Sequence, residues 1–195
     1  MTKSIILLFL FAFVSIASFS QTNSQTQKEC RITSGIGFSG ATKNTKSVGL
    51  DFWLQLDYKL SENISIATEF ENMTYKQPGY YKNLPVNPNE IKVVNNNFSL
   101  LLKYHFPIKS AFKVALASGW TYTTRQSDYF IYESDSTSER WFRNVTSFND
   151  YRIPVLLEIE YPVSKKLDIQ ARAKYNLNPQ NGDTYSCGLG LSLKL

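Results

Sequence analysis

The sequence predicts an all-β fold, an eight-stranded antiparallel transmembrane up-and-down β-barrel that follows a cleavable signal peptide. Three observations predict it. Apolar and polar residues alternate with a period of two along much of the 195-residue chain, which is typical of strands with one apolar face. After the N-terminal segment, no apolar run approaches the roughly 20 residues of a spanning helix. The connections between the alternating segments are short and long in turn along the chain, as in barrels that cross a membrane.

The first 20 residues have the features of a secretory signal peptide. Lys3 supplies a positive charge, the apolar run IILLFLFAFV covers residues 5–14, and small residues precede a cleavage position between Ser20 and Gln21. The apolar run is too short for a spanning helix. We therefore expect residues 1–20 to be removed during export.

Composition and charge favour a single exported domain in the rest of the chain. Residues 21–29 are polar and expected to be disordered, and residues 30–195 are long enough for one barrel. The net charge is +5, but the Lys and Arg residues are scattered without a basic cluster. We therefore expect no nucleic-acid partner.

The first four strands are expected at residues 30–40, 48–60, 64–71 and 98–106. In each of them an apolar residue alternates with a polar, charged or small one, and the second strand does so without a break. The apolar members are Ile32, Ile36, Phe38, Val48, Leu50, Phe52, Leu54, Leu56, Tyr58, Leu60, Ile64, Ile66, Phe70, Phe98, Leu100, Leu102, Tyr104 and Phe106.

The last four strands are expected at residues 112–122, 151–161, 167–175 and 187–195, with the same alternation. Pro154 cannot donate a ladder hydrogen bond, so we expect a β-bulge there. The apolar members are Phe112, Val114, Leu116, Trp120, Tyr122, Tyr151, Ile153, Val155, Leu157, Ile159, Tyr161, Leu167, Ile169, Ala171, Ala173, Tyr175, Cys187, Leu189, Leu191, Leu193 and Leu195.

Alternation alone fits two kinds of barrel, a membrane barrel with apolar side chains outside and a soluble, lipocalin-like, ligand-binding barrel with apolar side chains inside. Strands of about ten residues suit a membrane, because they span an apolar band about 25 Å tall. Aromatic residues of the apolar face also gather at both strand ends, where Tyr and Trp suit the membrane interfaces. They are Tyr58, Tyr104, Phe106, Phe112 and Tyr161 at the short-turn end and Trp120, Tyr122, Tyr151, Tyr175 and Tyr185 at the loop end.

The opposite face combines small residues with charges of both signs, which favours a narrow interior filled by paired side chains. An eight-stranded barrel filled in this way has no aqueous channel. Trp53, Leu101 and Leu156 share the parity of this face and are expected to fill the interior. The predicted interior charge network comprises Arg31, Asp51, Asp57, Lys59, Glu69, Glu71, Lys103, His105, Lys113, Arg152, Glu158, Glu160, Asp168, Arg172 and Lys174.

These features resemble the small eight-stranded outer-membrane proteins of the OmpA and OmpX type. The last strand, CGLGLSLKL, resembles the family's assembly signal, with apolar Leu193 and Leu195 at its third-from-last and last positions. The family usually ends in an aromatic residue, and Leu195 departs from that. The Asn- and Ser-rich loops resemble proteins of the Bacteroidota. The resemblance implies a bacterial outer-membrane location, contact with outer-membrane lipid and the barrel-assembly machinery, and a monomer.

Little in the sequence points to catalysis. Some barrels of this size are lipid A deacylases or acyltransferases, which use a His with a Ser and a carboxylate near the outer rim. The only histidine, His105, instead precedes a short turn, and its parity points it inward near Lys103, with Glu69 or Glu71 as partners. We expect a hydrogen-bonded interior histidine and no enzyme; a lipid A-modifying enzyme is the alternative function.

No disulfide, metal site or cofactor is expected. Cys30 and Cys187 lie on strands that must pair antiparallel, which places one low and the other high, beyond bridging distance. The sequence has no cluster of His, Cys and carboxylates with metal-ligand spacing.

Two of the longer loops carry aromatic side chains that suit binding. We expect the segment 125–145 to continue two strands above the membrane as a hairpin whose edge is suited to β-augmentation. The sequence thus favours a structural or adhesion protein that binds an extracellular protein or surface ligand. The candidate surface-binding residues are Tyr80, Tyr81, Tyr129, Phe130, Tyr132, Trp141 and Phe142.

Overall fold

The computed structural model describes residues 29–42, 48–77, 91–108, 110–135, 138–178 and 182–195, without the side chains of 129–144. The expected signal peptide and most of the polar segment after it lie outside the described residues, as do Tyr80 and Tyr81. Within the described ranges, no helix is long and apolar enough to cross a membrane.

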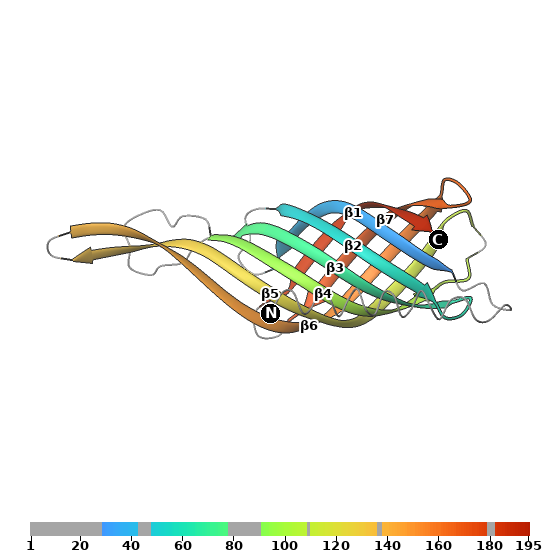
Figure 1. Ribbon diagram of the computed structural model, residues 1–195, viewed down its shortest axis with the longest axis horizontal. Coiled ribbons are helices and arrows are strands. Elements are labelled where there is room, and N and C mark those ends of the chain that lie inside the picture. Colours follow the sequence, from blue (N-terminus) through green and yellow to red (C-terminus); the bar gives the residue numbers. More distant parts are fainter. Residues whose placement is uncertain (1–28, 43–47, 78–90, 109, 136–137, 179–181) are drawn as a thin grey trace.

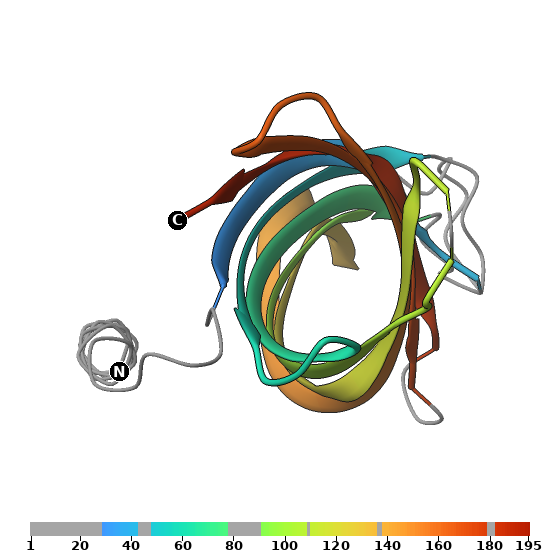
Figure 2. The ribbon, with the colours of Figure 1, turned by 90° about the vertical axis from the view of Figure 1, so that its right-hand side faces the viewer.

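Eight antiparallel strands form one closed barrel, which confirms the predicted fold. Figures 1 and 2 show the strands wrapping into a ring in chain order, with β8 returning to β1. The strands are β1 (Cys30–Ala41), β2 (Gly49–Lys59), β3 (Ile64–Gln77), β4 (Ile91–His105), β5 (Lys113–Asp135), β6 (Ser138–Pro162), β7 (Leu167–Leu177) and β8 (Thr184–Lys194).

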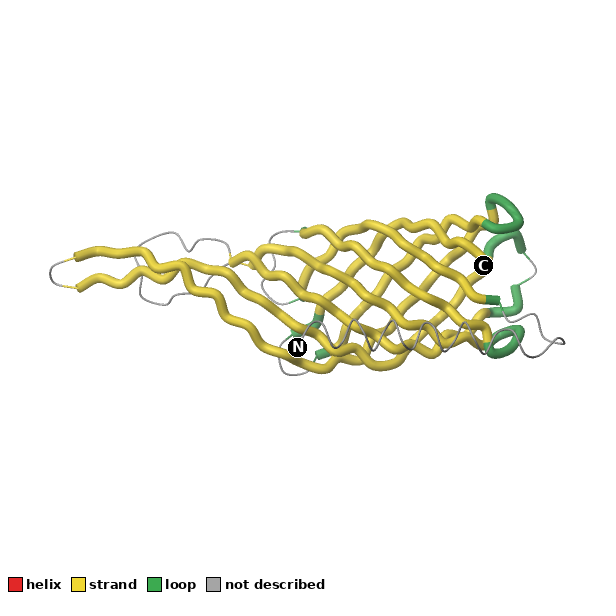
Figure 3. The backbone as a smooth tube through the Cα atoms, in the orientation of Figure 1, coloured by secondary structure: helices red, strands yellow, loops and turns green. Residues whose placement is uncertain are grey.

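Short turns join β2 to β3, β4 to β5 and β6 to β7 at one end of the barrel, drawn on the right of Figure 3. The backbone N–H of Leu60 donates to the carbonyl of Ile64 at 2.9 Å, and that of Val163 donates to Leu167 at the same distance. The start of β1 and the end of the chain lie at this end too, because Leu195 N donates to the Cys30 carbonyl at 2.9 Å.

At the other end, β5 and β6 extend far beyond the remaining strands (Figure 1). Their pairing runs up to Asp135↔Ser138, whereas β4 accompanies β5 only as far as Lys92↔Asp128 and β7 meets β6 only from Ile153↔Leu177. The predicted hairpin is thus present as a two-stranded ribbon. The expected strands 64–71, 98–106, 112–122 and 151–161 were too short at this end.

The bulge expected at Pro154 was wrong. The register between β5 and β6 is the same on either side of it, from Ser118↔Val155 to Thr121↔Arg152, and its pairing with Asn176 follows the regular β6–β7 register. No residue is inserted. The Ser118 hydroxyl donates to the Pro154 carbonyl at 2.9 Å, which satisfies that oxygen without a shift of the strand.

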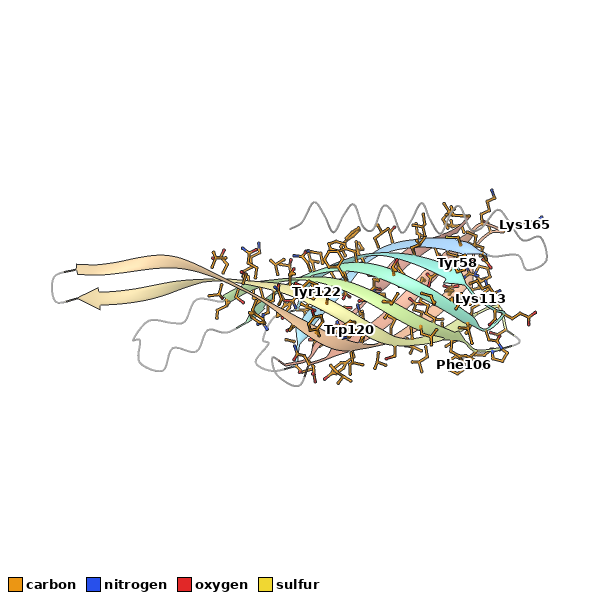
Figure 4. The ribbon with its side chains drawn as sticks, turned by 60° about the horizontal axis from the view of Figure 1, so that its bottom comes forward. Tyr58, Phe106, Lys113, Trp120, Tyr122 and Lys165 are labelled. Carbon is orange, nitrogen blue, oxygen red and sulfur yellow. The ribbon has the colours of Figure 1, made fainter. Side chains whose placement is uncertain are left out.

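Alternation separates two faces as expected. Leu189 on the outer face is 64% exposed, whereas Trp53, Leu101 and Leu156 on the inner face are buried. Aromatic side chains lie near both ends of the outer face, as Figure 4 shows for Tyr58 and Phe106 at the short-turn end and for Trp120 and Tyr122 where the ribbon leaves the barrel. Bare apolar side chains over a whole outer surface are stable in hydrocarbon, not in water.

Candidate functional site

A buried arginine lies at the centre of the interior charge network. The guanidinium of Arg172 donates to Glu69 at 2.5 Å, to Asp51 at 3.2 Å and to Glu71. Its Cζ also lies 3.9 Å from the centre of the Trp53 ring, so one cation meets three carboxylates and the face of an indole. This arrangement satisfies a charge that would be costly to bury alone.

Lys174 shares two of these carboxylates. Its ammonium donates to Glu69 at 2.5 Å, to Glu71 at 2.9 Å and to the Ser99 hydroxyl at 3.2 Å. The side-chain amide of Asn97 adds a hydrogen bond to Glu71 at 2.8 Å. Glu71 therefore accepts from strands on opposite sides of the barrel, and it ties β3, β4 and β7 together across the lumen.

Glycines make room for the indole at the seam between β1 and β8. A Cβ at Gly35 would lie 2.1 Å from Cζ2 of Trp53, and one at Gly188 would lie 2.8 Å from Cη2 of the same ring. Gly190 faces the ring at a similar height, with Cζ2 at 3.1 Å. The tryptophan therefore occupies lumen space that side chains on β1 and β8 would otherwise fill.

A second buried cluster surrounds Lys103. Its ammonium lies 2.7 Å from Asp57 and 2.5 Å from Glu158. The Gln55 amide donates to both carboxylates, at 2.8 Å and 3.1 Å. An apolar cluster adjoins it, formed by Ala67, Leu101, Ala117 and Leu156.

A third cluster lies at the short-turn end. Arg31 donates to Glu29 at 2.7 Å and to Glu160 at 2.6 Å, and Lys194 donates to Asp168 at 2.8 Å. Partial burial alone would raise the pKa of Glu29, but the hydrogen bond and charge of Arg31, with weaker help from neighbouring lysines, hold it below its ordinary value.

His105 lies at the short-turn end and faces a serine. Its Nε2 is 2.8 Å from the Ser65 hydroxyl, a hydrogen bond whose direction depends on the tautomer. The expectation that it would contact Glu69 or Glu71 was wrong, since these carboxylates hold Arg172 and Lys174. No histidine accompanies a serine at the loop end, because His105 is the only histidine of the chain.

Of the remaining predicted network residues, Arg152 lies apart from these clusters, and Lys59 and Lys113 lie beside the third one. Arg152 pairs with Asp150 at 2.9 Å and donates to Thr184 at 2.8 Å near the loop end. Lys59 and Lys113 lie at the mouth of the short-turn end, where Lys113 is 3.7 Å from Asp168.

Several side chains that point into the interior were not among the predicted ones, although they follow the same alternation. Continuing the alternation beyond the predicted strand ends would have found them, because Met73, Tyr75 and Val93 follow Glu71 and precede Asn97 at steps of two. With Ala41 they form an apolar cluster at the loop end. The missed polar partners are Glu29, Asn97 and Asp150.

The ribbon of β5 and β6 carries exposed side chains on its described lower part. Trp120 and Tyr151 stack with ring centres 5.0 Å apart, and each is about 60% exposed. Higher up, Arg125 lies over the ring of Phe148 at 5.2 Å, and Val145 is exposed. The predicted binding residues Tyr129, Phe130, Tyr132, Trp141 and Phe142 are all on the ribbon, but their side chains lie outside the described residues.

Cys30 and Cys187 are free thiols on β1 and β8, paired with Tyr58 and Phe38 respectively. In the part of the chain that the structure describes, no group of three or more His, Cys, Asp or Glu side chains has the geometry to hold a metal ion.

Comparisons with known proteins agree with this architecture. Residues 9–194 match the model of the "Outer membrane protein beta-barrel domain" family. A search of curated proteins found no match. Among solved structures, a major outer membrane protein from Thermus thermophilus is similar with a TM-score of 0.65 at 13% identity, over 86% of this chain and 99% of that one.

Two further structures show the same fold. Neisserial surface protein A has a TM-score of 0.55 at 14% identity, over 89% of this chain and all of that one. Ail, the attachment invasion locus protein of Yersinia pestis, has a TM-score of 0.54 at 12% identity, over 86% and 99%. With a family match over nearly its whole length and a closed eight-stranded barrel, the chain belongs to the outer membrane β-barrel family and is located in the bacterial outer membrane.

Proposed function

We propose that the protein is a non-enzymatic outer-membrane anchor that presents the ribbon of β5 and β6 to an extracellular protein or surface ligand. The observation that carries this proposal is the ribbon itself, which extends beyond every other strand (Figure 1). Interior packing supports it as well. Buried, mutually paired side chains fill the lumen, so the barrel is suited to hold the ribbon in place and not to conduct solutes.

The edge of β6 is the part of the ribbon best suited to binding. From Ser138 to about Asn149, β6 pairs with β5 on one side, while its pairing with β7 starts only at Ile153. Such an edge offers backbone donors and acceptors to a strand from another molecule. Side chains from Val145 to Asn149 are exposed on both faces of the ribbon, which leaves room for a partner.

The names of two structural relatives fit a surface role. One is a neisserial surface protein, and Ail is an attachment invasion locus protein that was also crystallised with the heparin analogue sucrose octasulfate. The structural similarity by itself supports only the fold. That this chain attaches to a surface is part of our proposal. We further propose that it acts as a monomer and reaches the membrane through the barrel-assembly machinery.

The test removes the ribbon and keeps the barrel. Asp128 and Val145 are paired residues, so an Asn-Gly pair joining them closes β5 and β6 with a two-residue hairpin turn. Bacteria producing the full or shortened protein are applied to surfaces coated with heparin or with a mixture of extracellular-matrix proteins. Several-fold higher retention of the full-length producers on either surface supports the proposal; equal retention on both contradicts it.

A second measurement separates this role from an enzyme of outer-leaflet lipid. Lipid A is extracted from cells with and without the gene, and its acyl chains are counted by mass spectrometry. We expect identical acyl-chain content. A chain missing or added only when the protein is present would favour a deacylase or acyltransferase instead.

A further inference from the structure

A cavity of about 230 Å³ opens at the short-turn end of the barrel, opposite the ribbon. Its walls come from the starts or ends of β1 to β6, and they include Asp57, Lys59, Glu62, Lys113 and Glu160. Figure 4 shows Lys113 at this end, near the girdle residues Tyr58 and Phe106. The proposed surface role, which concerns the opposite end, makes no use of this cavity.

Three of the four carboxylates in the wall of the cavity already contact a cation. Asp57 lies 2.7 Å from the buried ammonium of Lys103, and Glu160 accepts from Arg31 at 2.6 Å. Glu29, at the rim, accepts from the same arginine at 2.7 Å. Three carboxylates are thus held by two cations, and their oxygens are not free to attract a further cation strongly.

Two lysines at the mouth are held less closely, because both lie near Glu29, which Arg31 already binds. Lys113 is 3.7 Å from Asp168, which is longer than a hydrogen bond, and its side chain is 42% exposed. Lys59 forms no ion pair with any residue that the structure describes. Glu62, on the turn after β2, is exposed and likewise has no ion-pair partner in the described part of the chain. The mouth therefore offers two ammonium groups and one carboxylate for binding.

We propose that this cavity binds a small zwitterion, an amino acid or short peptide with a free ammonium and a free carboxylate. Lys59 and Lys113 receive the carboxylate, and Glu62 receives the ammonium. A ligand that carries one positive and one negative charge can pair both of them at this site. A simple cation or anion would instead also lie near a group of its own sign. The volume, below the roughly 300 Å³ or more typical of drug-sized ligand sites, suits a ligand of this size.

The test uses the mature protein refolded in detergent, with glycylglycine as the probe and amide chemical shifts in NMR as the readout. N-acetylglycylglycine, which lacks the ammonium, and glycylglycine amide, which lacks the carboxylate, are the matched ligands. We expect saturable shifts of residues around the cavity with glycylglycine and binding at least about threefold weaker for each blocked peptide, the effect of losing one exposed ion pair.

Protein variants provide the second arm. Lys59→Gln and Lys113→Gln are each expected to weaken glycylglycine binding about three- to fivefold and to leave binding of glycylglycine amide unchanged. Lys165→Gln is the control, because Lys165 is exposed at the same end of the barrel outside the cavity wall (Figure 4). Unchanged mobility of unheated samples on a gel shows that each variant is folded.

Three results would overturn the proposal: no saturable shift with glycylglycine, equal affinity for the blocked peptides, or the same loss in Lys165→Gln as in the cavity variants. The proposed surface role is tested separately, since removing the ribbon should leave glycylglycine binding unchanged.

Discussion

Replacing Arg172 by glutamine tests how the interior is stabilised. The substitution removes the cation that contacts Asp51, Glu69 and Glu71 together, while Lys174 still holds the two glutamates. Breaking a buried ion pair on one side costs about 3–5 kcal/mol, because the other charge stays buried without compensation. We expect the lower part of this range, about 3 kcal/mol, since one cation remains.

The free energy of unfolding is measured by denaturant titration in lipid vesicles, with tryptophan fluorescence as one probe and the mobility of unheated samples on a gel as another. Trp53 reports directly on the site, because its ring lies 3.9 Å from the guanidinium. The exposed Lys165→Gln variant loses the same charge at the surface and should stay within about 0.5 kcal/mol of the original protein.

A second substitution distinguishes electrostatic pairing from simple loss of packing. Glu71→Gln in the Arg172→Gln background removes one surplus negative charge, so the double variant should regain about 1–3 kcal/mol relative to Arg172→Gln alone. An Arg172→Gln variant within about 1 kcal/mol of the original protein would refute the reasoning, given the cost expected for an unpaired buried charge. Strictly additive effects of the two substitutions would do the same.

Three further predictions follow from the two faces and the rim. Gly35→Ala should destabilise the barrel by about 1–3 kcal/mol, because the new Cβ meets the Trp53 ring at 2.1 Å; a neutral effect in the same titration would show that the ring is not packed on the seam. Leu189→Arg, in the middle of β8 on the lipid face, should cost about 2–4 kcal/mol, and a cost below about 0.5 kcal/mol would indicate a water-exposed site. In the folded state Arg31 lowers the pKa of Glu29. The ionised carboxylate therefore stabilises the fold at pH values above the pKa that Glu29 has in the unfolded chain, and this stabilisation is lost as the pH falls. Denaturation midpoints measured from roughly pH 6 to 3 should therefore fall less steeply in Glu29→Gln, and parallel curves for the two proteins would contradict this.

Much of the membrane-embedded fold could be predicted because its apolar face alternates so regularly. Parity alone assigned Trp53, Leu101 and Leu156 to the interior, and the structure buries all three. Above the membrane this signal ends, since neither face of a strand needs to be apolar in water. The run Asn95–Asn97 in β4 shows the change, and for this reason the predicted strand began only at Phe98.

Partners across the lumen could not be predicted from the same pattern. Alternation shows which side chains point inward, but the stagger between strands decides which of them meet. His105 contacts Ser65 on β3 and not the glutamates two and three steps of alternation further along that strand. Arg172 and Glu71 are separated by 101 positions in the sequence, and only the closed register brings them together. The bulge at Pro154 was wrongly predicted for another reason. The β5–β6 pairing is interrupted at Pro154 and Ile153 and resumes in the same register, so the missing N–H is accommodated without an inserted residue.

The orientation of the two faces is tested most directly on β8 with a thiol that the chain already has. In a Cys30→Ser variant reconstituted in lipid vesicles, a nitroxide is attached to Cys187, which is exposed on the outer face. A second variant carries Cys30→Ser, Cys187→Ser and Ser186→Cys. It places the label at position 186, whose side chain is buried. We predict that the label at 187 collides freely with oxygen dissolved in lipid and poorly with a water-soluble nickel chelate, while the label at 186 is shielded from oxygen. Strong collision of the label at 187 with the nickel chelate would mean that this face meets water, and would contradict a barrel that turns its leucines toward lipid.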